Sequence, residues 1–187
     1  MKKIMILLVI MTMTTKIAAQ SITNASFEDG TTGWTVNKMQ LQTNDGMSTY
    51  RAGSTYIERW IAAPGLLGTA SVKQTVTGLS NGVYRLTVAA QNLSQNNTSA
   101  AQVGAWIVGN GLRTAVTTLG TYTLDFFVTD GTAEIGFVCD GASGNWVGCD
   151  NFQLSYRGNT NTYIQSAGNT VKNYANNLIS TATAQMP

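Results

Sequence analysis

The chain has 187 residues, two cysteines, no histidine and a formal net charge of +2 at pH 7. Without histidine, a serine or cysteine nucleophile lacks its usual general base, which disfavours hydrolases that use such a pair. After residue 19 the basic residues occur singly rather than in clusters, so we expect no nucleic-acid partner. The length is sufficient for one domain with a sizeable core.

Residues 1–19 have the pattern of a secretory signal peptide, with two lysines at the start, an apolar run over 4–13 and two alanines at the end. The apolar run is shorter than the roughly 20 residues of a membrane-spanning helix, and no later segment is a better candidate. Cleavage would remove three of the eleven basic residues and leave eight against nine acidic ones, a net charge of −1. We therefore expect a secreted protein located in the periplasm, at the cell surface or outside the cell.

Short segments of alternating apolar and polar residues follow the leader, separated by turn signals. The clearest hairpin has Ser80-Asn81-Gly82 ahead of a segment in which Tyr84 and Leu86 alternate with polar residues. Short strands with no helical segment between them predict an all-β sandwich or jelly roll. The expected strands are 21–27, 33–42, 54–61, 72–77, 83–91, 101–109, 112–118, 122–128, 132–138 and 149–156.

The pattern changes after residue 158. Residues 158–162 read as a linker, and apolar residues then recur every three or four positions over 163–184, which predicts an amphipathic helix. Either this helix packs on the sandwich or it opens a further domain, and we favour the second alternative. The expected organisation is thus a signal peptide (1–19), a β-domain (20–158), and a linker with a helix (159–187).

The two cysteines, Cys139 and Cys149, end one expected strand and begin the next. In an exported protein this placement predicts a disulfide that holds the intervening loop at its base. The alternative is a pair of buried thiols. Zinc is disfavoured, since there is no histidine and no third cysteine.

Four segments together carry a family resemblance: NASFEDGTTGWTV (24–36), TYIERW (55–60), VKQTVTGLSNGVYRLTVAAQ (72–91) and NWVGCDNFQLSY (145–156). In this order they resemble the galactose-binding-like jelly-roll modules of secreted bacterial polysaccharide-degrading enzymes. Those modules are non-catalytic and bind carbohydrate. The resemblance covers about residues 21–157 and implies a polysaccharide or glycan ligand, with a glycoside hydrolase domain as partner.

The resemblance also implies a structural calcium site at Glu28 and Asp150, with Asn24 as a possible helper and Glu58 as a weaker candidate. Ca²⁺ takes about six to eight oxygen ligands, and two carboxylates from the first and last strands would tie both ends of the domain together. The alternative is that these are solvated or capping carboxylates at strand ends.

Aromatic side chains are the strongest candidates for glycan contacts, because sugars stack their apolar faces on aromatic rings while neighbouring polar groups bind the hydroxyls. For each aromatic the alternative is a place in the core, and we expect that place for Trp34. The carbohydrate-binding candidates are Trp146, Asn145, Trp60, Trp106 and Tyr56.

No pair of acidic residues has the pattern of a glycosidase acid and base. We therefore expect a secreted β-sandwich jelly roll that binds a glycan and is not an enzyme. The alternative is a protein-interaction or assembly module of the cell surface with no glycan ligand.

Overall fold

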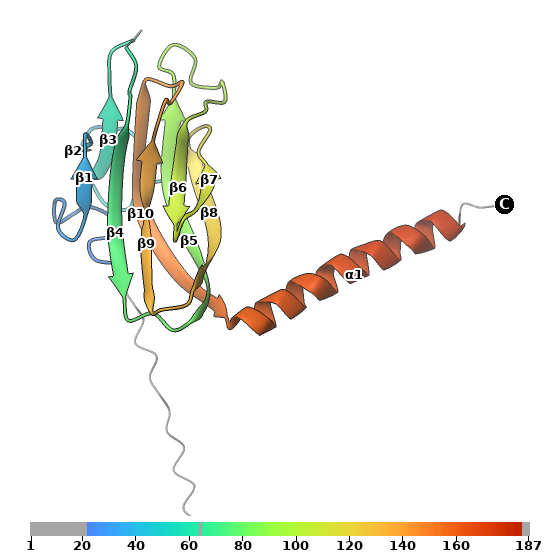
Figure 1. Cartoon of the computed structure of the whole chain (residues 1–187). Coiled ribbons are helices and arrows are strands. Elements are labelled where there is room, and N and C mark those ends of the chain that lie inside the picture. Colours follow the sequence, from blue (N-terminus) through green and yellow to red (C-terminus); the bar gives the residue numbers. More distant parts are fainter. Residues whose placement is uncertain (1–21, 64, 185–187) are drawn as a thin grey trace, which may run out of the picture.

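The computed structural model describes residues 22–63 and 65–184, so the predicted signal peptide lies outside the described residues. Two antiparallel five-stranded sheets pack face to face, and a single helix follows them (Figure 1). This confirms the predicted β-sandwich jelly roll.

The first sheet has the strand order β1-β4-β9-β6-β7 and the second the order β2-β3-β10-β5-β8. The strands of the first sheet are β1 (Thr35–Asn37), β4 (Ala70–Thr77), β9 (Thr132–Cys139), β6 (Ala105–Gly109) and β7 (Leu112–Ala115). Those of the second sheet are β2 (Gln40–Gln42), β3 (Tyr56–Trp60), β10 (Trp146–Gly158), β5 (Gly82–Leu93) and β8 (Gly120–Val128).

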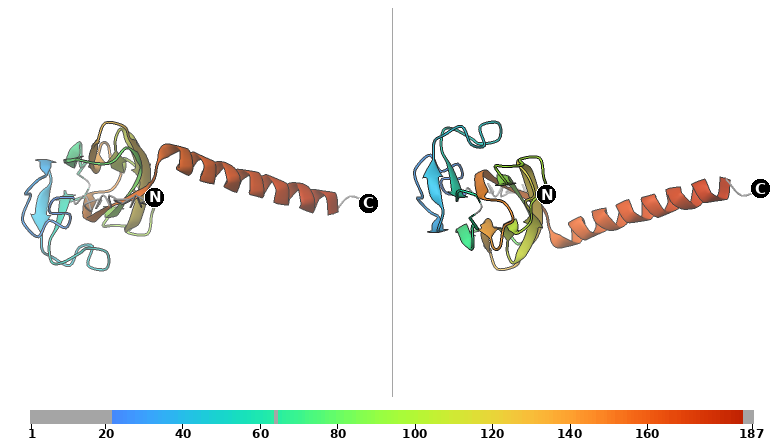
Figure 2. Two further views of the ribbon diagram at one scale, coloured as in Figure 1. Left: turned by 90° about the horizontal axis from the view of Figure 1, so that it is seen from below. Right: turned by 90° about the horizontal axis from the view of Figure 1, so that it is seen from above.

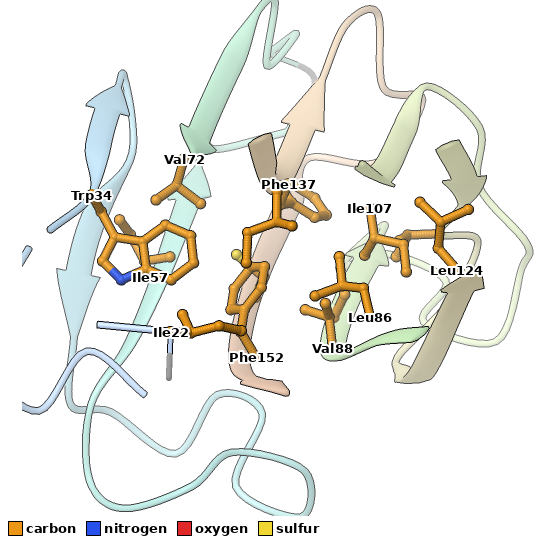
Figure 3. Close-up of a cluster of buried hydrophobic side chains, with 14 of the residues drawn as sticks. Ile22, Trp34, Ile57, Val72, Leu86, Val88, Ile107, Leu124, Phe137 and Phe152 are labelled. Carbon is orange, nitrogen blue, oxygen red and sulfur yellow. The ribbon is translucent and has the colours of Figure 1, made fainter. Parts of the chain in front are cut away.

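The core lies between the sheets and contains the apolar residues of the alternating segments. Leu86 and Val88 of β5 meet Ile107 and Phe137 of the first sheet there (Figure 3). All four side chains are fully buried. Because successive residues of a strand point to opposite faces, Arg85 and Thr87 of β5 lie on the outer face.

An aromatic cluster at one end of the core joins the start of the domain to its last strand. Trp34 lies 4.7 Å from Phe152, and Phe27 lies 5.1 Å from Trp34, between ring centroids. The Phe152 amide donates to the carbonyl of Ala25 at 3.0 Å. Trp34 is 8% exposed, which confirms its predicted place in the core.

The strand predicted over 21–27 is wrong, because residues 23–33 form consecutive turns and a bend. Asn24 and Phe27 have left-handed backbones, with φ of 48° and 57°, and such residues cannot continue a strand. The Asn24 side chain holds the turn: its Nδ2 donates to the carbonyls of Asp29 and Gly30, and its Oδ1 accepts from the Asp29 amide at 3.0 Å.

Among the other differences in strand bounds, two change the sheet or element to which residues belong. The segment 33–42 divides into β1 and β2, which belong to different sheets, and Lys38 between them has a left-handed φ of 55°. The last strand begins at Trp146 rather than Cys149, because residues 146–148 pair with Trp60, Arg59 and Glu58 of β3 and also with β5. Trp146 therefore lies on a strand and not in a loop.

The predicted disulfide is absent, since Cys139 and Cys149 are both buried free thiols. Cys139 lies on β9 and Cys149 on β10, in opposite sheets. The Cys139 Sγ points at the carbonyl of Gly68, 3.3 Å away, and donates to it. The alternative of two buried thiols thus describes the structure.

Thiol titration should reflect this arrangement. Burial raises the pKa of both thiols, most strongly that of Cys149, and keeps them away from reagent. We expect both cysteines to react with a thiol reagent in denaturant and neither to react rapidly in the native protein. An absence of free thiols in denaturant, in protein purified without oxidant, would contradict the structure.

The helix α1 (Thr160–Ala184) confirms the predicted helix and extends it by three residues at its start. It points away from the sandwich (Figures 1 and 2). Near its start the Tyr163 hydroxyl donates to Asp125 Oδ2 at 2.6 Å, and Arg85 forms an ion pair with the same carboxylate. Ile164 and Val171 are exposed. In the described part of the chain, no helix is long and apolar enough to cross a membrane.

Candidate functional site

A groove lies on the outer face of the second sheet. Ile57 of β3 faces the core, so Tyr56, Glu58 and Trp60 face outward. Trp146 of β10 pairs with Trp60, which brings the two indoles next to each other on this face. The groove has a volume of about 340 Å³ and is lined by Gln40, Gln42, Asn44, Glu58, Trp60, Gln95 and Trp146.

A smaller hollow of about 270 Å³ adjoins the groove, and the two share Gln40, Glu58 and Trp60. Two basic residues, Lys38 and Arg59, line this hollow. Arg59 is held in place because its Nε donates to the carbonyl of Leu67 and its Nη1 to that of Lys38. Lys38 itself is exposed.

The buried carboxylate of Glu58 holds the Trp146 indole. Trp146 Nε1 donates to Glu58 Oε2 at 2.5 Å, and the Tyr56 hydroxyl donates to the same oxygen at 2.6 Å. Tyr56 also lies 2.8 Å from Asn44 Oδ1. Glu58 is only 3% exposed and Tyr56 is fully buried. Hydrogen bonds to an ionised acceptor are the strong ones, so the Trp146 ring has a defined orientation.

The side chain of Gln95, which is itself bound by Asn145, holds the Trp60 indole. Trp60 Nε1 donates to Gln95 Oε1 at 2.7 Å, and Asn145 Nδ2 donates to the same oxygen at 3.1 Å. Asn145 Oδ1 accepts from the backbone N–H of Gln95 at 2.8 Å, while Asn145 Nδ2 also donates to the backbone carbonyl of Ile61. Trp60 is 44% exposed, so one surface of its ring is open to solvent although its N–H is tied.

The structure brings some of the predicted glycan contacts together and separates others. Trp60 and Trp146 line the groove, whereas Tyr56 and Asn145 are buried and support it from beneath. Trp106 lies on β6 of the other sheet, with the Arg113 guanidinium 4.6 Å from its ring centroid, outside the groove.

The sequence analysis missed the amide side chains that line the groove: Gln40, Gln42, Asn44 and Gln95. Gln40 and Gln42 lie on a strand of three residues, too short for a clear alternating pattern. Gln95 lies in a polar loop with no sequence signal for a site. Glu58 was predicted as a weak metal candidate and instead lies between Tyr56 and Trp146.

A second polar site surrounds Asp150 and Glu28. Asp150 is fully buried; its Oδ2 accepts from the Ala52 amide at 2.6 Å, and its Oδ1 has no partner. Glu28 is exposed and accepts from the amides of Ser54 and Thr55 and from the Ser54 hydroxyl. Burial, with a smaller contribution from the charge of Glu28, raises the pKa of Asp150 to about 7. The bond from the Thr55 amide is the main reason that the pKa of Glu28 is lowered.

These two carboxylates fit a hard cation such as Ca²⁺, because the buried Asp150 oxygen has no partner and the charge of Glu28 disfavours ionisation of Asp150 without one. Both ends of the Asn24 carboxamide form hydrogen bonds in the 24–30 turn. No cluster of three or more acidic, cysteine or histidine residues exists among the described residues, so backbone carbonyls or water would complete the coordination.

No protein-family model matches the sequence, and none of the curated proteins matches it. The structure has the galactose-binding-like jelly-roll fold found in carbohydrate-binding modules. It is similar to TmCBM61, solved in complex with β-1,4-galactotriose, with a TM-score of 0.53, 20% identity and coverage of 73% of this chain and 97% of that chain.

Two weaker similarities are to a family 16 carbohydrate-binding module and to a cyclase from Fischerella. The first has a TM-score of 0.48 and 18% identity, covering 71% of this chain and 96% of that one. The second has a TM-score of 0.46 and 14% identity, covering 74% and 97%.

Proposed function

We propose that this protein is a secreted, non-catalytic carbohydrate-binding module that holds a glycan chain in the groove against Trp60 and Trp146. The observation that carries the proposal is the pair of neighbouring indoles on the outer face, each tied by its N–H to a polar side chain. Fixed aromatic rings offer a surface for the apolar faces of sugars at little entropic cost.

The amides around the rings suit the hydroxyl groups of a sugar. Gln40, Gln42, Asn44 and Gln95 provide donors and acceptors along the groove. Each such bond replaces one to water and contributes only about 0.5 to 1.5 kcal/mol. We therefore expect modest affinity, roughly micromolar to millimolar.

The acidic residues argue against a glycosidase at this position. Among the described residues that line the groove, Glu58 is the one acid, and it already accepts from Trp146 and Tyr56. Glycosidases use two carboxyl groups about 5 to 10 Å apart on either side of the scissile bond. Binding without catalysis is the function that these residues support.

Calcium has a structural part in this proposal. Bound at Glu28 and Asp150, it would offset the buried charge and join β10 to the turns over residues 23–33. A glycoside hydrolase domain is the expected partner, and α1, which leaves the sandwich beside Asp125, would connect the two.

The exposed Ile164 and Val171 of α1 favour the second candidate function, a protein-interaction module.

A glycan screen tests the proposal. The purified protein would be run through native gels that contain single polysaccharides, and trisaccharides with β-1,4 linkages (galactose, glucose, xylose and mannose) would be titrated by calorimetry. Retention by at least one neutral polysaccharide is expected. If no glycan retards or binds the folded protein, the interaction-module alternative takes the place of this proposal.

Replacing Trp60 by Ala should weaken binding to the best glycan at least about tenfold, because it removes one of two stacking surfaces. The melting temperature should hardly change, since the Trp60 ring is 44% exposed. Trp106→Ala is the matched control, because its ring lies on the other sheet. A larger loss of binding in the Trp106 variant than in the Trp60 variant would place the site elsewhere.

A further inference from the structure

Two polar side chains of the groove, Glu58 and Gln95, each use one atom to hold an indole and keep a second atom unused. Glu58 Oε2 accepts from Trp146 and Tyr56, whereas Glu58 Oε1 has no partner in the described part of the chain. Gln95 Oε1 accepts from Trp60 and Asn145, whereas Gln95 Nε2 has none. Both residues line the same groove, one from β3 and one from the loop after β5.

We propose that Glu58 and Gln95 position the two indoles and also read the hydroxyl groups of a neutral sugar that lies between them. Glu58 Oε1 supplies an acceptor and Gln95 Nε2 a donor. A hydroxyl group can donate to the first and another can accept from the second, so the pair selects for the orientation of the hydroxyls. This inference rests on the proposed function and names the groups that give it specificity.

Charge defines the class of sugar. Glu58 is the one charged residue that lines the groove; Lys38 and Arg59 line only the adjoining hollow. Arg59 is bound to two carbonyls, and Lys38 is exposed to water, which screens its charge. A sugar carboxylate in the groove would face the Glu58 carboxylate with no cation between them. The groove is therefore selective for neutral glycans over uronic acids.

Substitutions separate positioning from ligand contact. Gln95→Ala removes both the acceptor that holds Trp60 and the free donor. Gln95→Glu keeps an acceptor for Trp60 and Asn145 but removes the donor. Glu58→Gln keeps an oxygen for Trp146 and Tyr56 but turns a donor toward the groove in place of the acceptor. Gln153→Ala, on an exposed part of β10, is the matched control.

The first measurement is tryptophan fluorescence quenching by acrylamide without any glycan. Gln95→Ala should increase quenching, because the Trp60 ring is no longer held, whereas Gln95→Glu, Glu58→Gln and Gln153→Ala should match the parent protein. An unchanged signal in folded Gln95→Ala would overturn the positioning role. This readout does not depend on whether a glycan binds.

The second measurement is affinity for the tightest of the four β-1,4-linked trisaccharides and for polygalacturonate, an acidic polysaccharide. Gln95→Glu and Glu58→Gln should each weaken trisaccharide binding roughly tenfold or more. Glu58→Gln should also narrow the preference for the trisaccharide over polygalacturonate. Parent-like affinities in both variants would overturn the inference and leave the proposed function standing. Failure of the parent protein to bind any glycan would refute the proposed function and, with it, the ligand-reading role.

Discussion

Replacing Asp150 by Asn is expected to stabilise the protein at pH 8 in the presence of a chelator, and to remove its response to Ca²⁺. Burial raises the pKa of Asp150 from 3.8 to about 7. Between these two pH values the folded protein keeps a proton that the unfolded chain releases, so stability falls as the pH rises. The loss is complete above about pH 7 and amounts to about 4 kcal/mol. An asparagine carries no charge, so the Asp150→Asn protein does not lose this stability as the pH rises.

Calcium should act in the opposite direction on the parent protein. Binding to the folded state alone adds about 2.7 kcal/mol of stability when the free ion is at 100 times its dissociation constant. Thermal unfolding at pH 5 and pH 8, with EDTA and with Ca²⁺, measures both effects. Asp45→Asn, which neutralises an exposed turn residue, is the control. If Ca²⁺ leaves the melting temperature of chelator-stripped parent protein unchanged, Glu28 and Asp150 do not form a calcium site.

Replacing Phe152 by Ala should produce the largest loss of stability, about 3 to 5 kcal/mol. Phe152 is 2% exposed and lies in the aromatic cluster with Trp34 and Phe27, which joins the start of the domain to β10. Its removal leaves a cavity that rigid neighbouring rings cannot close.

Equilibrium unfolding in urea measures the effect as a lower midpoint at similar slope. Phe127→Ala is the matched control, since this phenylalanine of β8 is 45% exposed and should cost far less. Equal destabilisation by the two substitutions would refute the central place of the aromatic cluster in the core.

The strands that the sequence predicted well are those with long alternation. In β5, Leu86 and Val88 face the core and Arg85 and Thr87 do not, as the period of two requires. Alternation of apolar and polar residues predicts the wrong structure where the backbone does not adopt an extended strand conformation. Asn24 and Phe27 adopt left-handed conformations stabilised by the Asn24 side chain, and these break a segment that reads as a strand.

The sequence alone was sufficient to select Trp60, Trp146, Tyr56, Asn145 and Trp106 as candidates, and to expect Trp34 in the core. It could not tell which of these five would line the groove. The pairing of Trp146 with Trp60 decided this, together with the burial of Tyr56 and Asn145. Alternation depends on neighbours along the chain, whereas pairing depends on segments far apart in sequence.

Only the tertiary structure could reveal the contacts of Gln95 and the state of the cysteines. Gln95 reaches Trp60 and Asn145 across 35 and 50 residues of sequence, a contact that no local pattern encodes. Cys139 and Cys149 are close in sequence yet belong to opposite sheets, and Cys139 points toward Gly68 instead of its expected partner. Local sequence therefore determined which residues face in or out, while packing between distant strands determined which of them meet.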